Sequence, residues 1–415
     1  MTTIITDIVT QHAEEAAFLW LLRDAAIYAP HYSLEELAEL DNRVEAHLDG
    51  LRIAGEGGWE ICKEQLAWEE AGEVFAASVI ALESGLNERY DTVLEAAVAS
   101  EEPARGFISA LGWLPYTQAK PYVMRLLAAE SAAMRCMGIA AAAIHRQDPG
   151  SHLQAALTDD DLQLRARALK AAGELGRRDL IKQVMKQKQA EDEACRFYAA
   201  WSAARLGDLY ANSVLCRIAE QGGPYAERAG AMALRAMRLS DAHAWQRHLA
   251  ERPDHHRLAV IGAGVIGDPV LVPWLFRAME TPDLARVAGE AFTMITDVDI
   301  AYDDLDGEWP EGFEAGPTED PEDDDVEMDA DEDLPWPEPE LIQAWWNANQ
   351  GDFRAGTRYL LGRPIDDASL AHALRNGQQR QRAAAALEQA VRQPDQSLFE
   401  VRAPGLRQQQ RLVHF

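Results

Sequence analysis

The amino-acid sequence predicts an all-α protein: a solenoid of paired helices, an α-α superhelix, interrupted by an acidic disordered insert. Helix-forming residues dominate as far as about residue 300, and the alternation of β-branched residues that marks strands is scarce. From about residue 104 the chain repeats itself, with similar segments about 28 to 33 residues apart. That period is typical of a two-helix repeat, which buries its core by stacking on its neighbours.

Residues 1–100 are expected to form an N-terminal helical region. Residues 8–26 place apolar side chains on one helical face. Ser33 and Glu36 have the S-x-x-E spacing of a capping box, in which each side chain bonds the other residue's free backbone N–H. A second helix is therefore predicted to begin after Ser33 and to stop near Gly55. Residues 60–84 indicate at least one further helix.

The repeat array is expected over residues 101–300. Three of its segments align without gaps when Gly176, Gly207 and Gly267 are superposed. Each glycine falls where the first helix of a repeat ends and the chain must turn through a left-handed conformation that costs glycine little. Less regular copies surround three other positions: Gly112, His145 and Leu239.

The stretch VIGAGVIGDP contains Gly262, Gly264 and Gly267 in the G-x-G-x-x-G spacing of a dinucleotide-binding loop. That loop would need a preceding strand and a helix directly after the glycines, whereas Pro269 follows too soon. The sister repeats carry alanine or serine at some of these positions, so the common requirement is a small side chain between packed helices. We therefore expect helix packing, with Asp268 capping the next helix and Pro269 in its first turn.

An acidic insert is expected over residues 301–335. From Asp303 to Glu340 the chain holds nineteen Asp and Glu residues and no Lys or Arg. Residues 303–333 are predicted to be largely disordered, because such a segment cannot bury enough apolar surface to offset its chain entropy. The insert either keeps the protein in solution or attracts a basic partner. A third alternative is that the basic C-terminal helices bind it within the molecule.

Residues 336–415 are expected to form a C-terminal helical region, beginning with a short helix from Glu338 to Asn347. The stretch from Thr357 onward reads as helix, Gly-Pro break, helix, break and helix, so the array is predicted to resume there. The tryptophans either pack across the junction or form an exposed partner site. The candidate partner-binding residues are Asp323, Asp324, Asp325, Trp336, Trp345 and Trp346.

Composition limits the classes of partner. The 39 basic and 69 acidic residues leave a formal charge of -30, which opposes binding to nucleic acid or to an anionic membrane. The N-terminus lacks the basic region of a signal peptide, and no run approaches the roughly 18 to 20 apolar residues of a membrane helix. The four cysteines are far apart, as expected for reduced thiols in a cytoplasmic protein.

No catalytic motif accompanies the repeats. None of the eleven histidines is followed directly by glutamate, the step that di-iron repeat hydroxylases use to place imidazole and carboxylate side by side. The G-x-S-x-G, H-E-x-x-H and G-x-x-x-x-G-K-S/T patterns are also missing. We therefore expect no catalytic residue, no metal and no cofactor, and a protein that is not an enzyme.

The repeat pattern, with LG, LGD or IGDP closing the first helix and V-x-x-L in the second, resembles HEAT-like repeats of the PBS-lyase type. Five further stretches resemble a family of bacterial HEAT-like proteins whose genes lie in type VI secretion clusters: VEAHLDGLRIAG, AGEAFTMITDVDI, LPWPEPELIQAWW, TRYLLGRPI and RQRAAAALE. This resemblance implies a HEAT-like α-solenoid that works in effector secretion, near spike-tip and effector-loading components. The family has no assigned catalytic residues, so the resemblance transfers none to this chain.

Two hypotheses about function follow. The first is a binding scaffold or adaptor, whose concave face, made by the second helices of the repeats, holds an effector, a spike-tip protein or a chaperone. The alternative is an enzyme of the PBS-lyase or metal-hydroxylase kind that modifies another protein. The clear repeats and the missing catalytic motifs favour the scaffold.

Overall fold

The computed structural model describes residues 5–316 and 328–413. The protein is all-α, as predicted, and it divides into two compact units. Unit 1 comprises Met1–Leu206, Gln378–Arg380 and Gln393–Phe415, and unit 2 comprises Gly207–Gly377 and Gln381–Arg392. The four regions expected from composition are divided differently, because the last part of the chain contributes to both units.

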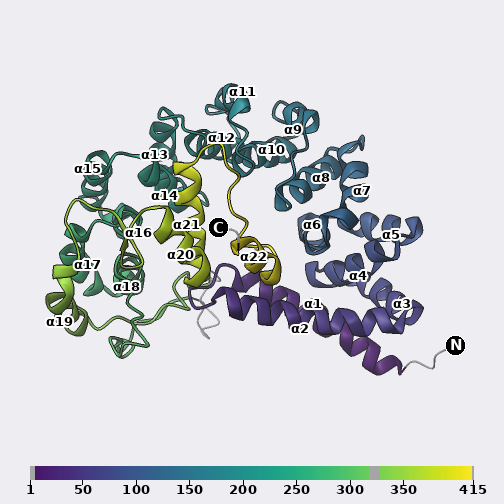
Figure 1. The fold of residues 1–415 in the computed structure, drawn as a ribbon, viewed down its shortest axis with the longest axis horizontal. Coiled ribbons are helices and arrows are strands. Elements are labelled where there is room, and N and C mark those ends of the chain that lie inside the picture. The colour runs from purple at the N-terminus through teal and green to yellow at the C-terminus, as the bar shows by residue number, and fades with distance from the viewer. Residues whose placement is uncertain (1–4, 317–327, 414–415) are drawn as a thin grey trace. The chain divides into compact units, whose positions relative to one another are not determined.

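Unit 1 consists of stacked helix pairs and one C-terminal helix (Figure 1). Its α-helices are α1 (Thr6–Ala26), α2 (Leu34–Ala54), α3 (Glu56–Gln65), α4 (Ala71–Ser84), α5 (Asn87–Ala97), α6 (Glu101–Trp113), α7 (Tyr116–Leu127), α8 (Ala132–Ile144), α9 (Ser151–Ala156), α10 (Leu162–Glu174), α11 (Ile181–Lys186), α12 (Glu193–Arg205) and α22 (Gly405–Leu412). Two 3-10 turns, η1 (Leu66–Trp68) and η2 (Arg178–Leu180), join them.

Unit 2 repeats the same arrangement and adds a small hairpin. Its helices are α13 (Ala211–Gln221), α14 (Ala226–Ala236), α15 (Leu239–Ala250), α16 (His256–Ile266), α17 (Val272–Met279), α18 (Pro282–Thr296), α19 (Pro339–Asn349) and α20 (Asp367–Asn376). The 3-10 turns are η3 (Pro253–His255), η4 (Pro269–Leu271) and η5 (Gln350–Asp352), and the strands are β1 (Tyr359–Leu360) and β2 (Arg363–Pro364). Helix α21 (Gln379–Arg392) contributes to both units.

The predicted start of α2 is confirmed. Ser33 Oγ accepts the backbone N–H of Glu36 at 3.2 Å, and a Glu36 carboxylate oxygen accepts that of Ser33 at 2.8 Å. These hydrogen bonds lower the pKa of Glu36. The helix ends at Gly55, as the sequence predicts.

The glycines of the G-x-G-x-x-G stretch serve helix packing, so the prediction is confirmed. Gly262 and Gly264 lie inside α16 rather than after a strand. A Cβ on Gly264 would lie 3.0 Å from the Cα of Ala291 in α18, so the glycine lets the two helices approach. Gly267 ends α16 with a φ of 70°, and Asp268 caps the following turn by accepting the N–H of Val270.

The first helices of successive repeats stack on one another in both units: α4, α6, α8, α10 and α12 in unit 1, and α14, α16 and α18 in unit 2. In unit 1 the second helices α5, α7, α9 and α11 lie along the outer edge, whereas the first helices lie on the inner side (Figure 1). The expectation that second helices form the concave face is therefore wrong for unit 1. A partner that binds the inner side would meet first helices.

The residues TRYLL, before the expected Gly-Pro break, were predicted to be helical, and the structure corrects this. Tyr359 pairs with Pro364 and Leu360 with Arg363 in an antiparallel hairpin. Leu361 and Gly362 form its turn with φ angles of 51° and 67°. Positive φ at both central residues suits the twist of a tight hairpin, and a helix cannot continue through it. The helices predicted after this stretch are present as α20 and α21.

Candidate protein-interaction site

The two ends of the acidic insert lie together in unit 2. The backbone N–H of Gly307 donates to the carbonyl of Trp336 at 2.8 Å, and that of Glu338 donates to the carbonyl of Leu305 at 2.9 Å. These bonds join residues before and after the insert across an antiparallel bridge. The insert therefore leaves unit 2 from a closed base, which we define as residues 303–316 and 328–337.

Two arginines from first helices hold the C-terminal side of this base. Arg286 of α18 forms two bonds to the Asp329 carboxylate, at 2.6 and 3.0 Å, and one to the Asp331 carbonyl at 2.8 Å. Arg257 of α16 binds the Asp331 carboxylate with both terminal nitrogens, at 2.7 and 2.8 Å. Bidentate pairs of this kind fix geometry as well as charge.

The base is therefore not the disordered loop that its composition predicts. Residues 303–316 and 328–333 have a defined placement, because helices of unit 2 supply arginine partners that the insert itself lacks. These arginines belong to the repeats rather than to the C-terminal helices that were considered as an intramolecular partner. Asp323, Asp324 and Asp325 lie outside the described residues.

The pairing with Arg286 changes the titration of Asp329. Burial opposes ionisation of this carboxylate, but hydrogen bonds from Arg286 and from the Asp331 backbone outweigh it and lower the pKa of Asp329. The hydrogen bond to Asp331 likewise raises the pKa of Arg257. Asp329 and Arg257 thus remain charged through the neutral range.

A cluster of three aromatic rings lies beside Arg286, and two of them contact its guanidinium. The centroids of Trp309, Phe313 and Trp336 lie 5.2 to 5.6 Å apart. The Arg286 guanidinium carbon lies 4.9 Å from the Trp309 ring centroid and 5.7 Å from that of Trp336. Trp336, a predicted partner-binding residue, is thus half-buried in a cluster whose outer ring is Trp309.

Trp345 and Trp346 lie elsewhere, in the core of unit 2. Both contact Phe292 of α18 edge to face, with centroids 5.7 and 6.4 Å away. Trp346 is only 6% exposed and also packs on Phe353. This placement is the packing arrangement that the sequence left as an alternative, and it does not bring either ring beside Trp336.

A second feature of interest is the extended segment of residues 393–404 in unit 1. Arg205, at the end of α12, donates to the carbonyls of Pro394 (2.6 Å) and Gln396. The N–H of Leu398 donates to the Glu174 carbonyl at 2.8 Å. This segment thus runs across the C-terminal ends of α12 and α10, held mainly through its backbone.

The same segment continues past α8. Arg146 donates from Nε to the Leu398 carbonyl at 2.6 Å and pairs with Glu400 at 3.0 Å. Beyond it, Arg407 in α22 donates to three carbonyls at the end of α6: those of Gly112, Trp113 and Leu114. The C-terminal chain therefore crosses four first helices in reverse order.

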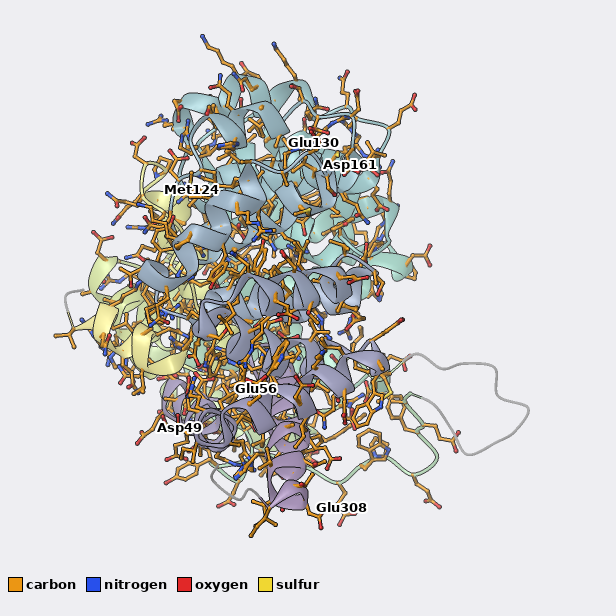
Figure 2. The ribbon with its side chains drawn as sticks, turned by 90° about the vertical axis from the view of Figure 1, so that its right-hand side faces the viewer. Asp49, Glu56, Met124, Glu130, Asp161 and Glu308 are labelled. Carbon is orange, nitrogen blue, oxygen red and sulfur yellow. The ribbon has the colours of Figure 1, made fainter. Side chains whose placement is uncertain are left out.

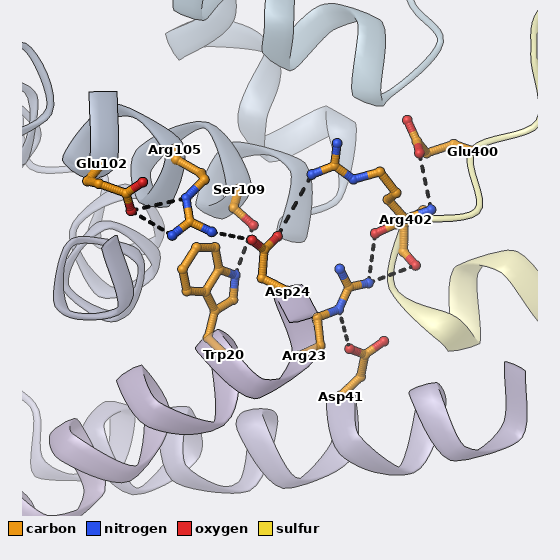
Figure 3. Close-up of polar contacts among 10 residues, drawn as sticks. Trp20, Arg23, Asp24, Asp41, Glu102, Arg105, Ser109, Glu400 and Arg402 are labelled. Carbon is orange, nitrogen blue, oxygen red and sulfur yellow. Dashed lines mark hydrogen bonds and ion pairs between the residues drawn. The ribbon is translucent and has the colours of Figure 1, made fainter. Parts of the chain in front are cut away.

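Figure 3 shows how α1 and α2 hold this chain. Arg23 of α1 pairs with Asp41 at 2.8 Å and donates to the carbonyls of Arg402 and Ala403 at 2.7 and 3.0 Å. The Arg402 side chain lies 3.8 Å from the Asp24 carboxylate. Because Arg23 and Asp41 are both buried, this junction is part of the unit 1 core.

Unit 2 has an equivalent segment over residues 353–364. The N–H of Tyr359 donates to the Gly267 carbonyl at 2.8 Å, at the end of α16. Arg358 donates to the carbonyls of Ile266 and Val265 and pairs through two bonds of 2.9 Å with Glu388. In both units, therefore, a segment outside the repeats binds the ends of first helices; in unit 2 this segment includes the β1–β2 hairpin.

Burial shifts the pKa values of several cysteine and histidine side chains. Burial raises the pKa of Cys62, Cys195 and Cys216 to about 12 and also raises that of Cys136, so these thiols stay protonated at neutral pH. His145 is buried and its Nε2 lies 2.8 Å from the Leu111 carbonyl. Among residues 5–316 and 328–413, no three His, Cys, Asp or Glu side chains gather as a metal site.

The arginines that hold these segments were missed at the sequence level. The available signal was positional: Arg146 and Arg205 each end an alanine-rich first helix, where the surrounding residues predict burial. A buried arginine needs acceptors, and the carbonyls of an extended chain supply them. The carbonyls that Arg205 and Arg146 bind, however, lie 189 and 252 residues away in the sequence.

Comparisons with known proteins support the repeat assignment. Residues 150–235 match the model for HEAT repeats. The comparison with curated proteins finds no match. Within the described ranges, no helix has the length and apolar character needed to cross a membrane. HEAT repeats in general suggest a scaffold for protein interaction, and the fold of this chain is consistent with that role.

Proposed function

We propose that this protein is a non-enzymatic scaffold that binds a protein partner during effector or spike-tip loading in a type VI secretion system. The observation that carries the scaffold role is that, in both units, the C-terminal ends of the first helices bind another segment of the chain. In each unit these helix ends form hydrogen bonds with backbone groups of that segment. The secretion context is supported by the five sequence stretches that resemble the secretion-associated family.

The scaffold role agrees with the state of the reactive groups. Protonated thiols are poor nucleophiles, and the Cys residues with raised pKa values are integral to repeat helices. Arg205 and Arg286 serve the fold, by holding carbonyls and by pairing with a carboxylate. Exposed surface on the second helices and at the insert base is then available for a partner.

The test is affinity purification of the tagged full-length chain from a bacterium that carries the secretion cluster, followed by mass spectrometry. We expect enrichment of a spike-tip protein, an effector or a loading chaperone over a tagged control of similar charge. The same strain without the gene is expected to secrete less of that effector. Normal secretion together with no enriched secretion component would overturn the proposed context.

A further inference from the structure

The insert base places large apolar side chains at the surface of unit 2. Trp309 is 51% exposed and Met328 is 66% exposed, while Phe313 and Trp336 are half-buried. Trp309, Phe313 and Trp336 are in mutual contact, and Met328 adjoins Asp329, which pairs with Arg286 beneath them. We call the three rings of Trp309, Phe313 and Trp336 the aromatic patch.

The aromatic patch is held rigidly from below. The indole N–H of Trp309 donates to the Phe313 carbonyl at 2.7 Å, which fixes the ring orientation. Arg286 is 4% exposed and is bound to both Asp329 and the backbone of Asp331. A partner therefore meets a preorganised surface and loses little entropy in ordering it.

The rings of this patch already bind a guanidinium group. Arg286 lies against Trp309 and Trp336 at distances where the negative face of an indole attracts a cation. Its carboxylate partner, Asp329, completes an arrangement of indole, guanidinium and carboxylate. The exposed part of Trp309 offers the same chemistry to a second cation from outside.

Acidic side chains surround the patch. Glu308, Glu311 and Glu314 are exposed, and within the described chain none of them has an ion-pair partner. Exposed acidic residues also precede them: Asp303, Asp304 and Asp306. The sequence from 303 to 338 contains no Lys or Arg. A partner segment with positive charge and planar groups is therefore the one that this surface complements.

We propose that the aromatic patch and its acidic rim form a docking surface for an arginine-bearing segment of a protein partner. This proposal rests on the scaffold function and names the chemistry of the partner. Arginine is favoured over lysine because its planar guanidinium stacks on an indole and also forms bidentate bonds to carboxylates. The rim steers the segment to the patch, and the exposed indole selects for arginine.

The test measures binding of an arginine-rich synthetic peptide to the purified full-length protein, with the same peptide carrying lysine at every arginine as comparison. The Glu308→Lys/Glu311→Lys/Glu314→Lys variant neutralises the rim, because Asp303, Asp304 and Asp306 remain, and it leaves the aromatic side chains unchanged. We expect its affinity for the arginine peptide to fall about tenfold or more, and the salt dependence of binding to weaken.

A matched variant controls for electrostatic attraction by the net negative charge of the whole protein. Glu95→Lys/Glu130→Lys/Asp160→Lys changes the net charge equally at exposed sites in unit 1; Glu130 and Glu308 both lie at the surface (Figure 2). We expect this variant to bind the arginine peptide nearly as the original protein does. Equal losses in the two triple variants would show that only the overall charge attracts the peptide, and would overturn the proposal.

A second variant tests the indole. Trp309→Leu keeps an apolar side chain against Phe313 and Trp336 and is expected to weaken arginine-peptide binding roughly fivefold, with a smaller loss for the lysine peptide. If the Trp309→Leu variant prefers the arginine peptide over the lysine peptide as strongly as the original protein does, the indole ring does not select for arginine. If secretion components are still recovered while both peptide tests fail, the scaffold function stands and its partner binds another surface.

Discussion

The extended segments of unit 1 and unit 2 bind the same position of the repeat in opposite ways. In unit 1 the arginines belong to the repeat helices, and Arg205 and Arg146 donate to carbonyls of residues 393–404. In unit 2 the arginine belongs to the segment, and Arg358 donates to the carbonyls of Val265 and Ile266. The C-terminal end of a first helix can therefore accept hydrogen bonds through its carbonyls or donate them through an arginine.

This difference determines how each segment is recognised. Unit 1 reads mainly the backbone of its segment, whose residues Gln396 and Ser397 have exposed side chains. Unit 2 binds its segment through backbone bonds from Tyr359 and Gly362 and adds a side-chain anchor, because Arg358 also pairs with buried Glu388. A repeat surface that holds only backbone groups tolerates sequence change in its ligand, whereas one that also requires a buried ion pair tolerates less.

The largest effect is expected from breaking the ion pair of unit 2. Arg358→Met removes the bidentate partner of buried Glu388, leaves it only Arg235 with its Nε 4.0 Å away, and should destabilise unit 2 by about 3 to 5 kcal/mol. Faster hydrogen exchange over residues 353–364, measured by mass spectrometry, would locate the damage.

Arg205→Met is the matched change in unit 1, and it should cost less, about 1 to 3 kcal/mol. Arg205 is fully buried, and burial lowers its pKa to about 10, so the original side chain already carries a desolvation cost. The variant loses hydrogen bonds to two carbonyls but leaves no charge behind. Equal destabilisation by Arg205→Met and Arg358→Met would contradict the distinction between backbone and side-chain anchoring.

The next effect concerns the glycines beneath the two segments. Gly267 and Gly176 both have a φ of 70°, but an added Cβ would lie 2.2 Å from the Tyr359 carbonyl oxygen at Gly267 and 2.7 Å from that of Gln396 at Gly176. Gly267→Ala should therefore destabilise more, by about 3 kcal/mol, because conformational strain and displacement of the segment add.

Gly85→Ala supplies the control for backbone conformation alone. Gly85 has a φ of 69° with no atom near the added Cβ, so alanine there should cost only about 1 kcal/mol of strain. Urea unfolding of the three alanine variants should rank them Gly267, Gly176 and Gly85 in decreasing loss. A loss at Gly267 no greater than that at Gly85 would mean that residues 353–364 move aside at little cost.

Local chemistry explains which parts of this structure could be predicted from the sequence. The left-handed glycines, the capping box at Ser33 and the packing role of Gly264 follow from signals within a few residues or within one repeat period. The HEAT-like fold was predictable because each repeat shows the same sequence pattern of two helices separated by a glycine turn. None of these inferences requires knowledge of distant contacts.

The extended segments and the insert base could not be predicted for the opposite reason. Residues 393–404 have no periodic pattern, and their hydrogen bonds reach helices far earlier in the chain. The composition around Asp329 indicates disorder, but the pairing with Arg286, 43 residues away, overrides it. The hairpin at Leu360 was read as helix because its neighbours are strong helix formers, whereas the Leu361–Gly362 turn decides the conformation.

A last expected effect, which appears only below neutral pH, distinguishes unit 1 from unit 2. Burial, with Arg407 and Arg411 nearby, lowers the pKa of His145 in unit 1 to about 4; hydrogen bonding to Leu111 and the charge of Glu400 act against this shift. The folded state therefore keeps His145 neutral while the unfolded chain protonates near its ordinary pKa of about 6.5.

Stability from neutral His145 is thus fully present above about pH 6.5 and declines as the pH falls toward 4, by about 2 kcal/mol between pH 7 and pH 5. His145→Gln retains a side-chain donor for Leu111 but cannot titrate, so its unfolding free energy should change less over this range. Hydrogen exchange at pH 7 and pH 5 should show the difference at residues 398–400, beside Arg146, and not at residues 353–364 of unit 2. Identical pH profiles for the variant and the original protein would mean that His145 is protonated as readily when folded as when unfolded.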